Sequence, residues 1–225
     1  MARVILPLVF GLLGCAILVS LGIWQVQRLA WKQGVLAQID ARITAAPVAL
    51  PIRPDRQRDQ YLAVTAQGQV APGVVRILVS QKGAGAGYRI ISPLRVGARR
   101  VLLDRGVMPV DRDVTAAPAG DVQVVGNLLW PDEIDGFTPA PDLAANIWFA
   151  RDLVALSGAL ETEPVMIVMR ARTFDDYPIS PLPVGTEGIP NDHLGYALTW
   201  FSLALVWAGM TGFFLWRMKR PRTEG

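Results

Sequence analysis

The chain has 225 residues, a hydrophobic fraction of 52% and a formal net charge of +3. Soluble domains contain about 45–50% apolar residues, so this fraction, with a mean hydropathy of +0.33, argues against an ordinary soluble protein. The basic excess is concentrated near the C-terminal end and no basic patch with interleaved aromatic residues occurs, so we expect no nucleic-acid partner.

Two uncharged runs, one at each end, are long enough to cross a membrane. Val4–Trp24 has 21 residues and Leu194–Trp216 has 23. A helix rises about 1.5 Å per residue, so each run spans the ~30 Å hydrocarbon core. The first run exceeds the apolar region of a cleaved signal peptide, which favours an uncleaved anchor. We predict transmembrane helices at residues 1–24 and 193–216, in contact with the lipid bilayer.

Basic residues near the span ends predict the orientation. Arg3 precedes the first span, and the tail 217–225 after the second carries four basic residues, so both termini are expected to be cytoplasmic. Arg28 and Lys32 oppose this orientation, but the tail outweighs them and long loops translocate largely regardless of charge. No Arg- and Ser-rich leader precedes the first span, which favours a bacterial inner membrane with residues 25–192 in the periplasm.

Beyond the first span the helical pattern continues. Leu29, Leu36 and Ile43 recur at seven-residue spacing, which predicts a helical extension over residues 25–46. Three prolines then end it, and a solvated loop is expected over residues 47–60.

Residues 61–175 are expected to form an α+β domain. Short β-leaning runs are separated by glycine-containing breaks, which predicts an antiparallel sheet that can curl into a barrel. Asp152–Leu160 has helical spacing with Asp152 as its N-cap, and a Pro- and Gly-rich linker follows at residues 176–192. The predicted strands are Tyr61–Val70, Val74–Ser80, Tyr88–Arg95, Arg100–Asp104, Val122–Leu129 and Val165–Thr173.

The domain offers little ordinary catalytic chemistry. Gly83–Gly87 precedes a strand-like run rather than a helix, which favours a hairpin loop over a nucleotide-binding turn. Asp104–Gly106 and Asp111–Asp113 fit a strand end and a turn held by charge pairs better than acid/base groups. The single cysteine, Cys15, lies within the first span. We therefore do not expect an enzyme.

The only histidine, His193, stands at the mouth of the second span. An ionisable residue at a membrane boundary is a candidate ligand, although near an end it can simply contact water and headgroups. A neutral imidazole is a good haem iron ligand. On a helix it shares one face with Tyr196, Ala197, Trp200 and Ala204.

Residues at and just beyond the end of the first span are expected at about the membrane depth of His193, because the two spans run antiparallel. Trp24, Arg28 and Lys32 fall near His193, and the cations could pair with haem propionates. An interfacial aromatic belt is the alternative interpretation of Trp24, Tyr196 and Trp200. Small residues on the first span suit close helix packing, namely Gly11, Cys15 and Gly22.

Several segments together resemble one family, the surfeit-locus cytochrome c oxidase assembly proteins. The resemblance covers the exit of the first span, the entry of the second and points between them. The segments that carry it are Leu21–Lys32, Tyr61 with Val64 and Gly68, Gly87–Tyr88, Pro93–Leu94, Val101–Gly106 with Pro109, and Asn191–Phe201.

The resemblance implies a factor that assembles the haem–copper oxidase. Its bacterial members look like carriers or insertion factors for haem a, with the oxidase catalytic subunit as partner and the haem a synthesis enzyme as a further one. Carried onto this chain, it implies His193 as the haem iron ligand and Trp24, Arg28 and Trp200 as further cofactor-binding positions. A scaffold that grips the oxidase subunit without binding haem is the alternative.

Overall fold

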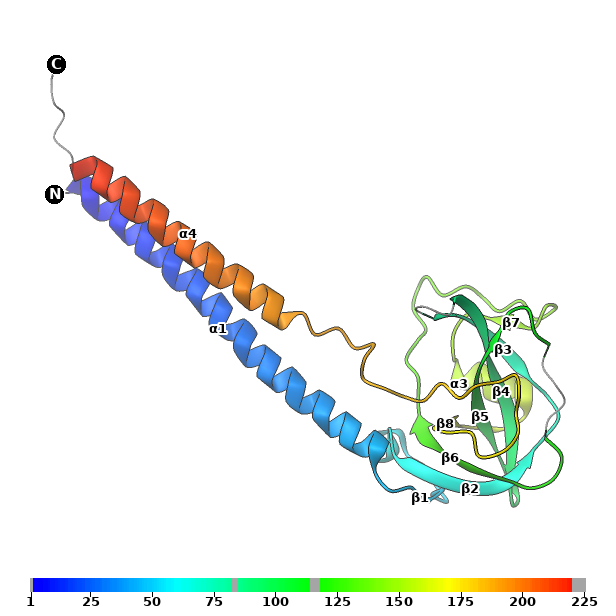
Figure 1. The fold of residues 1–225 in the computed structure, drawn as a ribbon. Coiled ribbons are helices and arrows are strands. Elements are labelled where there is room, and N and C mark those ends of the chain that lie inside the picture. The colour runs from blue at the N-terminus through cyan, green and yellow to red at the C-terminus, as the bar shows by residue number, and fades with distance from the viewer. Residues whose placement is uncertain (1, 82–84, 114–117, 220–225) are drawn as a thin grey trace. The chain divides into compact units, whose positions relative to one another are not determined.

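The structure is a computed structural model, which describes residues 2–81, 85–113 and 118–219. The chain divides into two compact units (Figure 1). One consists of Met1–Gln38 and Thr186–Gly225, and the other of Ile39–Gly185. Of the predicted basic tail, Arg217 and Lys219 are described, whereas Arg220 and Arg222 lie outside the described residues.

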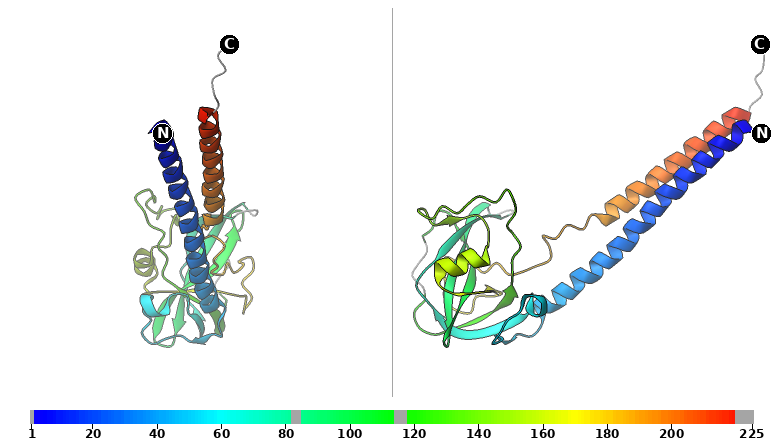
Figure 2. Two further views of the ribbon diagram at one scale, coloured as in Figure 1. Left: turned by 90° about the vertical axis from the view of Figure 1, so that its left-hand side faces the viewer. Right: turned by 180° about the vertical axis from the view of Figure 1, so that it is seen from behind.

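The first unit is built on two long apolar helices, α1 (Ala2–Thr44), of which it holds the part up to Gln38, and α4 (His193–Lys219). Both are long and apolar enough to cross a membrane, which agrees with the two predicted spans. Helix α1 has 43 residues, or about 65 Å at ~1.5 Å per residue, so it extends well beyond a single span. The helix thus continues beyond the predicted span and ends at Thr44, where the extension was predicted to reach residue 46. The two helices lie side by side in all the views (Figures 1 and 2).

The second unit is rich in β-structure, and its strands within the described residues form one eight-stranded sheet. Two short helices accompany it, α2 (Arg56–Asp59) and α3 (Leu153–Leu160). The strands are β1 (Val48–Ala49), β2 (Ala63–Val70), β3 (Val75–Gln81), β4 (Gly85–Val96), β5 (Arg99–Pro109), β6 (Val122–Leu129), β7 (Ile147–Trp148) and β8 (Glu163–Met169).

Five of these strands close into a barrel in the order β2–β6–β8–β5–β4. The ring closes where Gln69 and Val70 of β2 pair with Arg95 and Leu94 of β4. A Cβ at Gly68 would collide with the carbonyl oxygen of Arg95, so a glycine lets the two strands meet. The predicted sheet that curls into a barrel is thus present. Beyond the prediction, β5 and β8 pair in parallel, as do β1 with β2 and β3 with β7.

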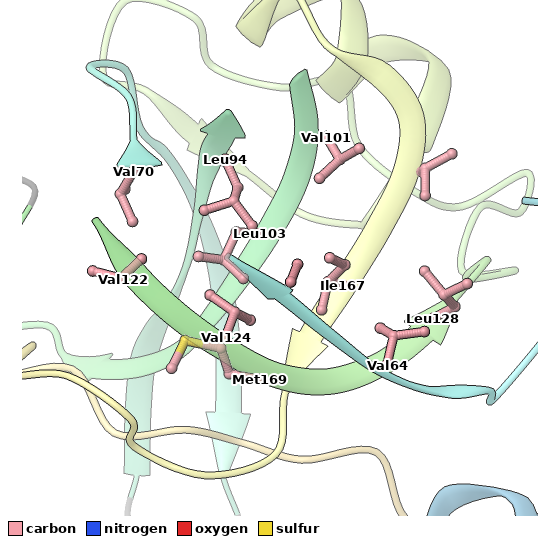
Figure 3. Close-up of a cluster of buried hydrophobic side chains, with 12 residues drawn as sticks. Val64, Val70, Leu94, Val101, Leu103, Val122, Val124, Leu128, Ile167 and Met169 are labelled. Carbon is pink, nitrogen blue, oxygen red and sulfur yellow. The ribbon is translucent and has the colours of Figure 1, made fainter. Parts of the chain in front are cut away.

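The barrel interior is one hydrophobic core, and a second core lies beneath α3. In β5, Val101 and Leu103 belong to the interior core, while Leu102 between them packs in the second. This alternation explains the uninterrupted apolar runs, because both faces of the strand are buried. Figure 3 shows the interior side chains pointing toward one another from all five barrel strands.

Helix α3 begins as predicted. The Asp152 carboxylate accepts hydrogen bonds from the backbone N–H groups of Val154 (2.9 Å) and Ala155 (3.1 Å), which makes it the N-cap. Leu156 and Leu160 are the buried residues that fix the helix on the second core.

Charged side chains lie inside this domain, where they form ion pairs. Asp104, fully buried in the middle of β5, pairs with Arg89 and with Arg151. Burial raises the pKa of the Asp104 carboxyl, and the two guanidinium groups oppose that rise. Arg105 and Asp176 form a second buried pair, with Nε and Oδ2 2.9 Å apart. The charge pairing was predicted for Asp104–Gly106, but the position at a strand end was wrong, because β5 continues to Pro109.

Some predicted boundaries differ from the structure. Strand β8 ends at Met169, before the predicted Thr173. Gly85–Gly87, predicted as loop, begins β4, while Gly83 and Ala84 lie outside the described residues. The turn predicted at residues 111–113 is present, with Arg112 N–H bonded to Pro109 O (3.2 Å).

The segments predicted as loop and linker also contain structure. The predicted loop 47–60 holds β1 and α2. The predicted linker 176–192 is packed on the barrel domain at its start. There Ile179 is fully buried, and Ser180 exchanges two backbone hydrogen bonds with Val107 (2.8 and 2.9 Å).

Candidate functional site

Helix α4 begins at His193 for a local reason. Pro190, Asn191 and Asp192 precede it, and Asn and Asp are favoured at the start of a helix. The Asp192 carbonyl accepts the hydrogen bond of Tyr196 N–H at 3.2 Å, which closes the first turn. The histidine is therefore held on the first turn of the helix rather than in the irregular segment before it.

The imidazole of His193 contacts a glutamine of α1. Its Nδ1 lies 2.8 Å from Oε1 of Gln25, and only 8% of Gln25 is exposed. An amide oxygen only accepts hydrogen bonds, so Nδ1 carries the proton and the lone pair of the neutral ring lies on Nε2. No residue that the structure describes forms a hydrogen bond with Nε2. The ring thus keeps one nitrogen available for a metal ion.

Small residues of α1 allow α4 to approach closely. A Cβ at Gly22 would lie 2.6 Å from the ring of Phe201, and one at Gly11 would collide with Thr211. Cys15 Sγ lies 3.9 Å from the carbonyl oxygen of Ala204. The predicted small-residue stripe is confirmed as the face on which the helices pack.

Further along the same interface, Gly14 of α1 packs against the indole of Trp207 of α4, a contact that was not predicted. A Cβ at Gly14 would collide with the indole of Trp207. The N–H of that indole donates to the carbonyl oxygen of Gly11 at 3.0 Å. This hydrogen bond links the two helices within their apolar segments, where alternative partners are scarce.

The face of α4 that packs on α1 repeats at steps of four and three residues. Ala197 and Ala204 are buried, at 2% and 7% exposed, and His193 and Trp200 lie on the same face, partly buried. Tyr196 departs from the predicted face, because 57% of it is exposed. The histidine therefore belongs to the helix–helix interface and the tyrosine does not.

Comparison with known proteins identifies the family. The model of the SURF1 family matches residues 12–205. The chain belongs to the SURF1 family. Relatives share its sequence over most of their length. The SURF1-like protein of Drosophila melanogaster is 29% identical over 226 residues, covering 88% of this chain and 72% of that protein.

Bacterial and vertebrate relatives match similarly. The SURF1-like protein of Rickettsia felis is 29% identical over 200 residues, covering 84% of this chain and 88% of that protein. The human Surfeit locus protein 1 is 26% identical over 211 residues, covering 82% of this chain and 69% of that protein. The resemblance inferred from the sequence motifs is confirmed, and the match to the SURF1 family includes α1 from residue 12 onward and the first half of α4.

Two buried polar atoms near the start of α4 lack partners in this SURF1 family member. The indole N–H of Trp200 and the side-chain oxygen of Asn191 form no hydrogen bond with any residue that the structure describes. A buried polar group without a partner costs free energy, and native proteins keep few of them. One donor on α4 and one acceptor just before its first residue are thus available to a ligand or a partner protein.

Trp24 and Arg28 flank this site rather than forming its interior. Trp24 is 54% exposed, and the Arg28 guanidinium lies 3.8 Å from the ring centroid of Trp31. They are four residues apart, so they share a ridge of α1 adjacent to Gln25. The structure therefore brings Gln25, and not Trp24 or Arg28, into hydrogen-bond contact with His193.

The sequence reasoning missed Gln25, although a signal was present. Gln25 follows Gly22 by three residues and Leu18 by seven, which places its amide on the packing face of α1. A polar side chain at such a position in an apolar seam requires a partner. The neighbouring Gln27 is exposed and lies off the face of α1 that packs on α4.

Replacing Gly22 tests the close approach. In a chain that carries Ala204→Cys, oxidation should join the new cysteine to Cys15, measured as loss of both thiols to maleimide-PEG on a denaturing gel. Adding Gly22→Leu should lower the cross-linked fraction several-fold, because leucine collides with Phe201.

Gly209→Leu is the matched control, because a side chain at Gly209 would meet nothing within 4 Å. Equal cross-linking in the Gly22 and Gly209 variants would contradict the packing described above.

Proposed function

We propose that this chain assembles the haem–copper cytochrome c oxidase by binding haem a through His193 and aiding its transfer to the catalytic subunit. The observation that carries the haem part is the His193 ring, with Nδ1 bonded to Gln25 and Nε2 without a partner among the described residues. Membership of the SURF1 family supports the oxidase part.

The residues at the site fit a haem as cargo. His193 offers a neutral nitrogen of the type that ligates haem iron. Arg28 lies on the adjoining ridge, where its guanidinium suits a propionate, and Trp24 offers an exposed ring. Trp200 adds a buried N–H donor that has no acceptor among the described residues. The imidazole would donate an electron pair to the iron of a bound haem, and the other three side chains would hold the haem in place.

The position of His193 suits this cargo physically. It begins the apolar helix α4, so it is expected at the boundary between lipid and water. Haem a has a long apolar tail and charged propionates. At such a boundary the tail can remain in hydrocarbon while the propionates face water. Neither the exposure of the apolar tail to water nor the burial of the charged propionates then costs free energy.

The proposal includes location and partners. Both termini would be cytoplasmic in a bacterial inner membrane, with the barrel domain in the periplasm. The basic residues Arg217 and Lys219 at the end of α4 support this orientation. The oxidase catalytic subunit would receive the haem, and the haem a synthesis enzyme would supply it.

Absorption spectroscopy tests the haem assignment. The chain, co-expressed with haem a synthesis enzymes and purified, should carry haem a, and His193→Ala should lose most of it or shift its spectrum. Tyr196→Ala is the matched control, because this residue is one turn away and exposed, and it should retain the haem.

A wild-type chain without haem, or an unchanged spectrum in His193→Ala, would contradict ligation by His193. If oxidase assembly in cells still required the haem-free chain, a scaffold role would replace the proposal.

Thiol labelling tests the orientation. In a Cys15→Ser chain, Asp111→Cys should react with a membrane-impermeant maleimide in spheroplasts, whereas Met218→Cys should react only after lysis. Both positions are exposed, so accessibility within the protein does not limit either reaction. The opposite labelling pattern would show that the orientation is inverted.

A further inference from the structure

Gln25 is an unusual residue for its position. It directly follows Trp24, where the predicted first span ends, and only 8% of it is exposed. A buried amide costs free energy unless it is hydrogen-bonded, and the cost rises where water is excluded. Its side-chain oxygen contacts Nδ1 of His193 on the other helix. At this position α1 and α4 are thus joined by a polar contact between two side chains.

The geometry of that contact determines the state of the imidazole. Because Oε1 accepts the hydrogen bond at 2.8 Å, the proton is held on Nδ1. In a neutral imidazole the other nitrogen must then carry the lone pair. The same bond fixes the rotation of the ring, since His193 and Gln25 are on different helices that pack through small residues.

We propose that Gln25 is a positioning residue, which holds His193 with Nδ1 protonated so that Nε2 is the ligating atom. The assignment of haem iron as the metal rests on the function proposed above. Histidine ligands commonly donate their other ring N–H to a carboxylate or a carbonyl, which fixes the tautomer and raises the basicity of the ligand. The side-chain carbonyl of Gln25 supplies that acceptor from α1.

The contact has a consequence for uptake and release of the cargo. The ligand is on α4 and its orienting acceptor is on α1, so the oriented ligand exists only while the helices are paired. Separation of the helices at this end would free the ring to rotate and would weaken its hold on the metal. A partner protein that displaces α1 from α4 would thereby favour release.

The single histidine makes the tautomer directly measurable. A chain labelled with ¹⁵N in histidine alone has two ring nitrogens, and long-range ¹H–¹⁵N correlation in nanodiscs without haem identifies which one is protonated. In the wild type and in Gln25→Glu, Nδ1 should carry the proton, because both side chains present an acceptor oxygen. In Gln25→Leu that preference should be lost.

Gln27→Leu is the matched control, since Gln27 is the same residue type two positions along α1 and is exposed. It should leave the ring nitrogens as in the wild type. A wild type protonated at Nε2, or a Gln25→Leu chain that keeps the proton on Nδ1, would overturn the proposal whether or not haem binds.

Haem titration provides the second measurement. Gln25→Leu should bind haem a about 10–100-fold more weakly, as other losses of such an orienting partner do. Gln25→Glu should retain the affinity and lower the midpoint potential of the iron, because a carboxylate makes the imidazole a stronger donor to the ferric state. A purely structural hydrogen bond would not move the potential in this direction.

The two proposals fail separately. If the wild type binds no haem, the haem function is lost, and the tautomer measurement alone decides the role of Gln25. If haem binds through His193 with equal affinity in Gln25→Leu, the haem function stands and the positioning role is wrong.

Discussion

The close packing of α1 on α4 is the constraint on which the candidate site depends. Glycines on α1 leave room for Phe201, Trp207 and Thr211 of α4, so the two backbones can approach. At that separation Gln25 reaches His193, and a hydrogen bond between the buried amide and the partly buried imidazole replaces contacts with water. Between lipid-embedded helices there is no hydrophobic driving force for association, so shape and hydrogen bonds set the geometry. The site is therefore built by both ends of the chain together.

The barrel domain is stabilised differently, by strands buried on both faces and by paired charges. Its core strands are apolar on both faces, because β5 and β8 pack into the barrel and also under α3. Among the residues that the structure describes, the buried charges are paired, as Arg105 is with Asp176. Asn127 of β6 donates to the carbonyl oxygen of Ile43 (2.9 Å), which satisfies one of the carbonyl groups left open at the end of α1. The domain shows no cluster of metal-ligating residues among those described, whereas the helix pair contains the histidine.

Local sequence signals predicted most elements but not their pairing. Strand β6 and helix α3 were predicted closely, because Asp152 and the glycine-containing breaks mark their limits. The parallel pairing of β5 with β8 and the closure of β2 on β4 join residues far apart in the chain, and no local pattern encodes them. At the site, His193 was identifiable as the only histidine beside a span. Gln25 was missed, because only its helical phase with Gly22 separates it from Gln27, and the partner that shows its role is on α4.

The central claim is that the Nε2 atom of His193 ligates the iron of bound haem. Pulsed electron–nuclear double resonance on the ferric, haem-loaded chain, with ¹⁵N in histidine alone, measures this directly. The chain contains one histidine, so a ¹⁵N coupling of the size typical of an iron-bound nitrogen can arise only from His193 of this or a second copy. Ligation through Nε2 predicts such a coupling, with a weaker one from the protonated Nδ1. A haem-loaded sample with no ¹⁵N coupling to the iron would contradict it.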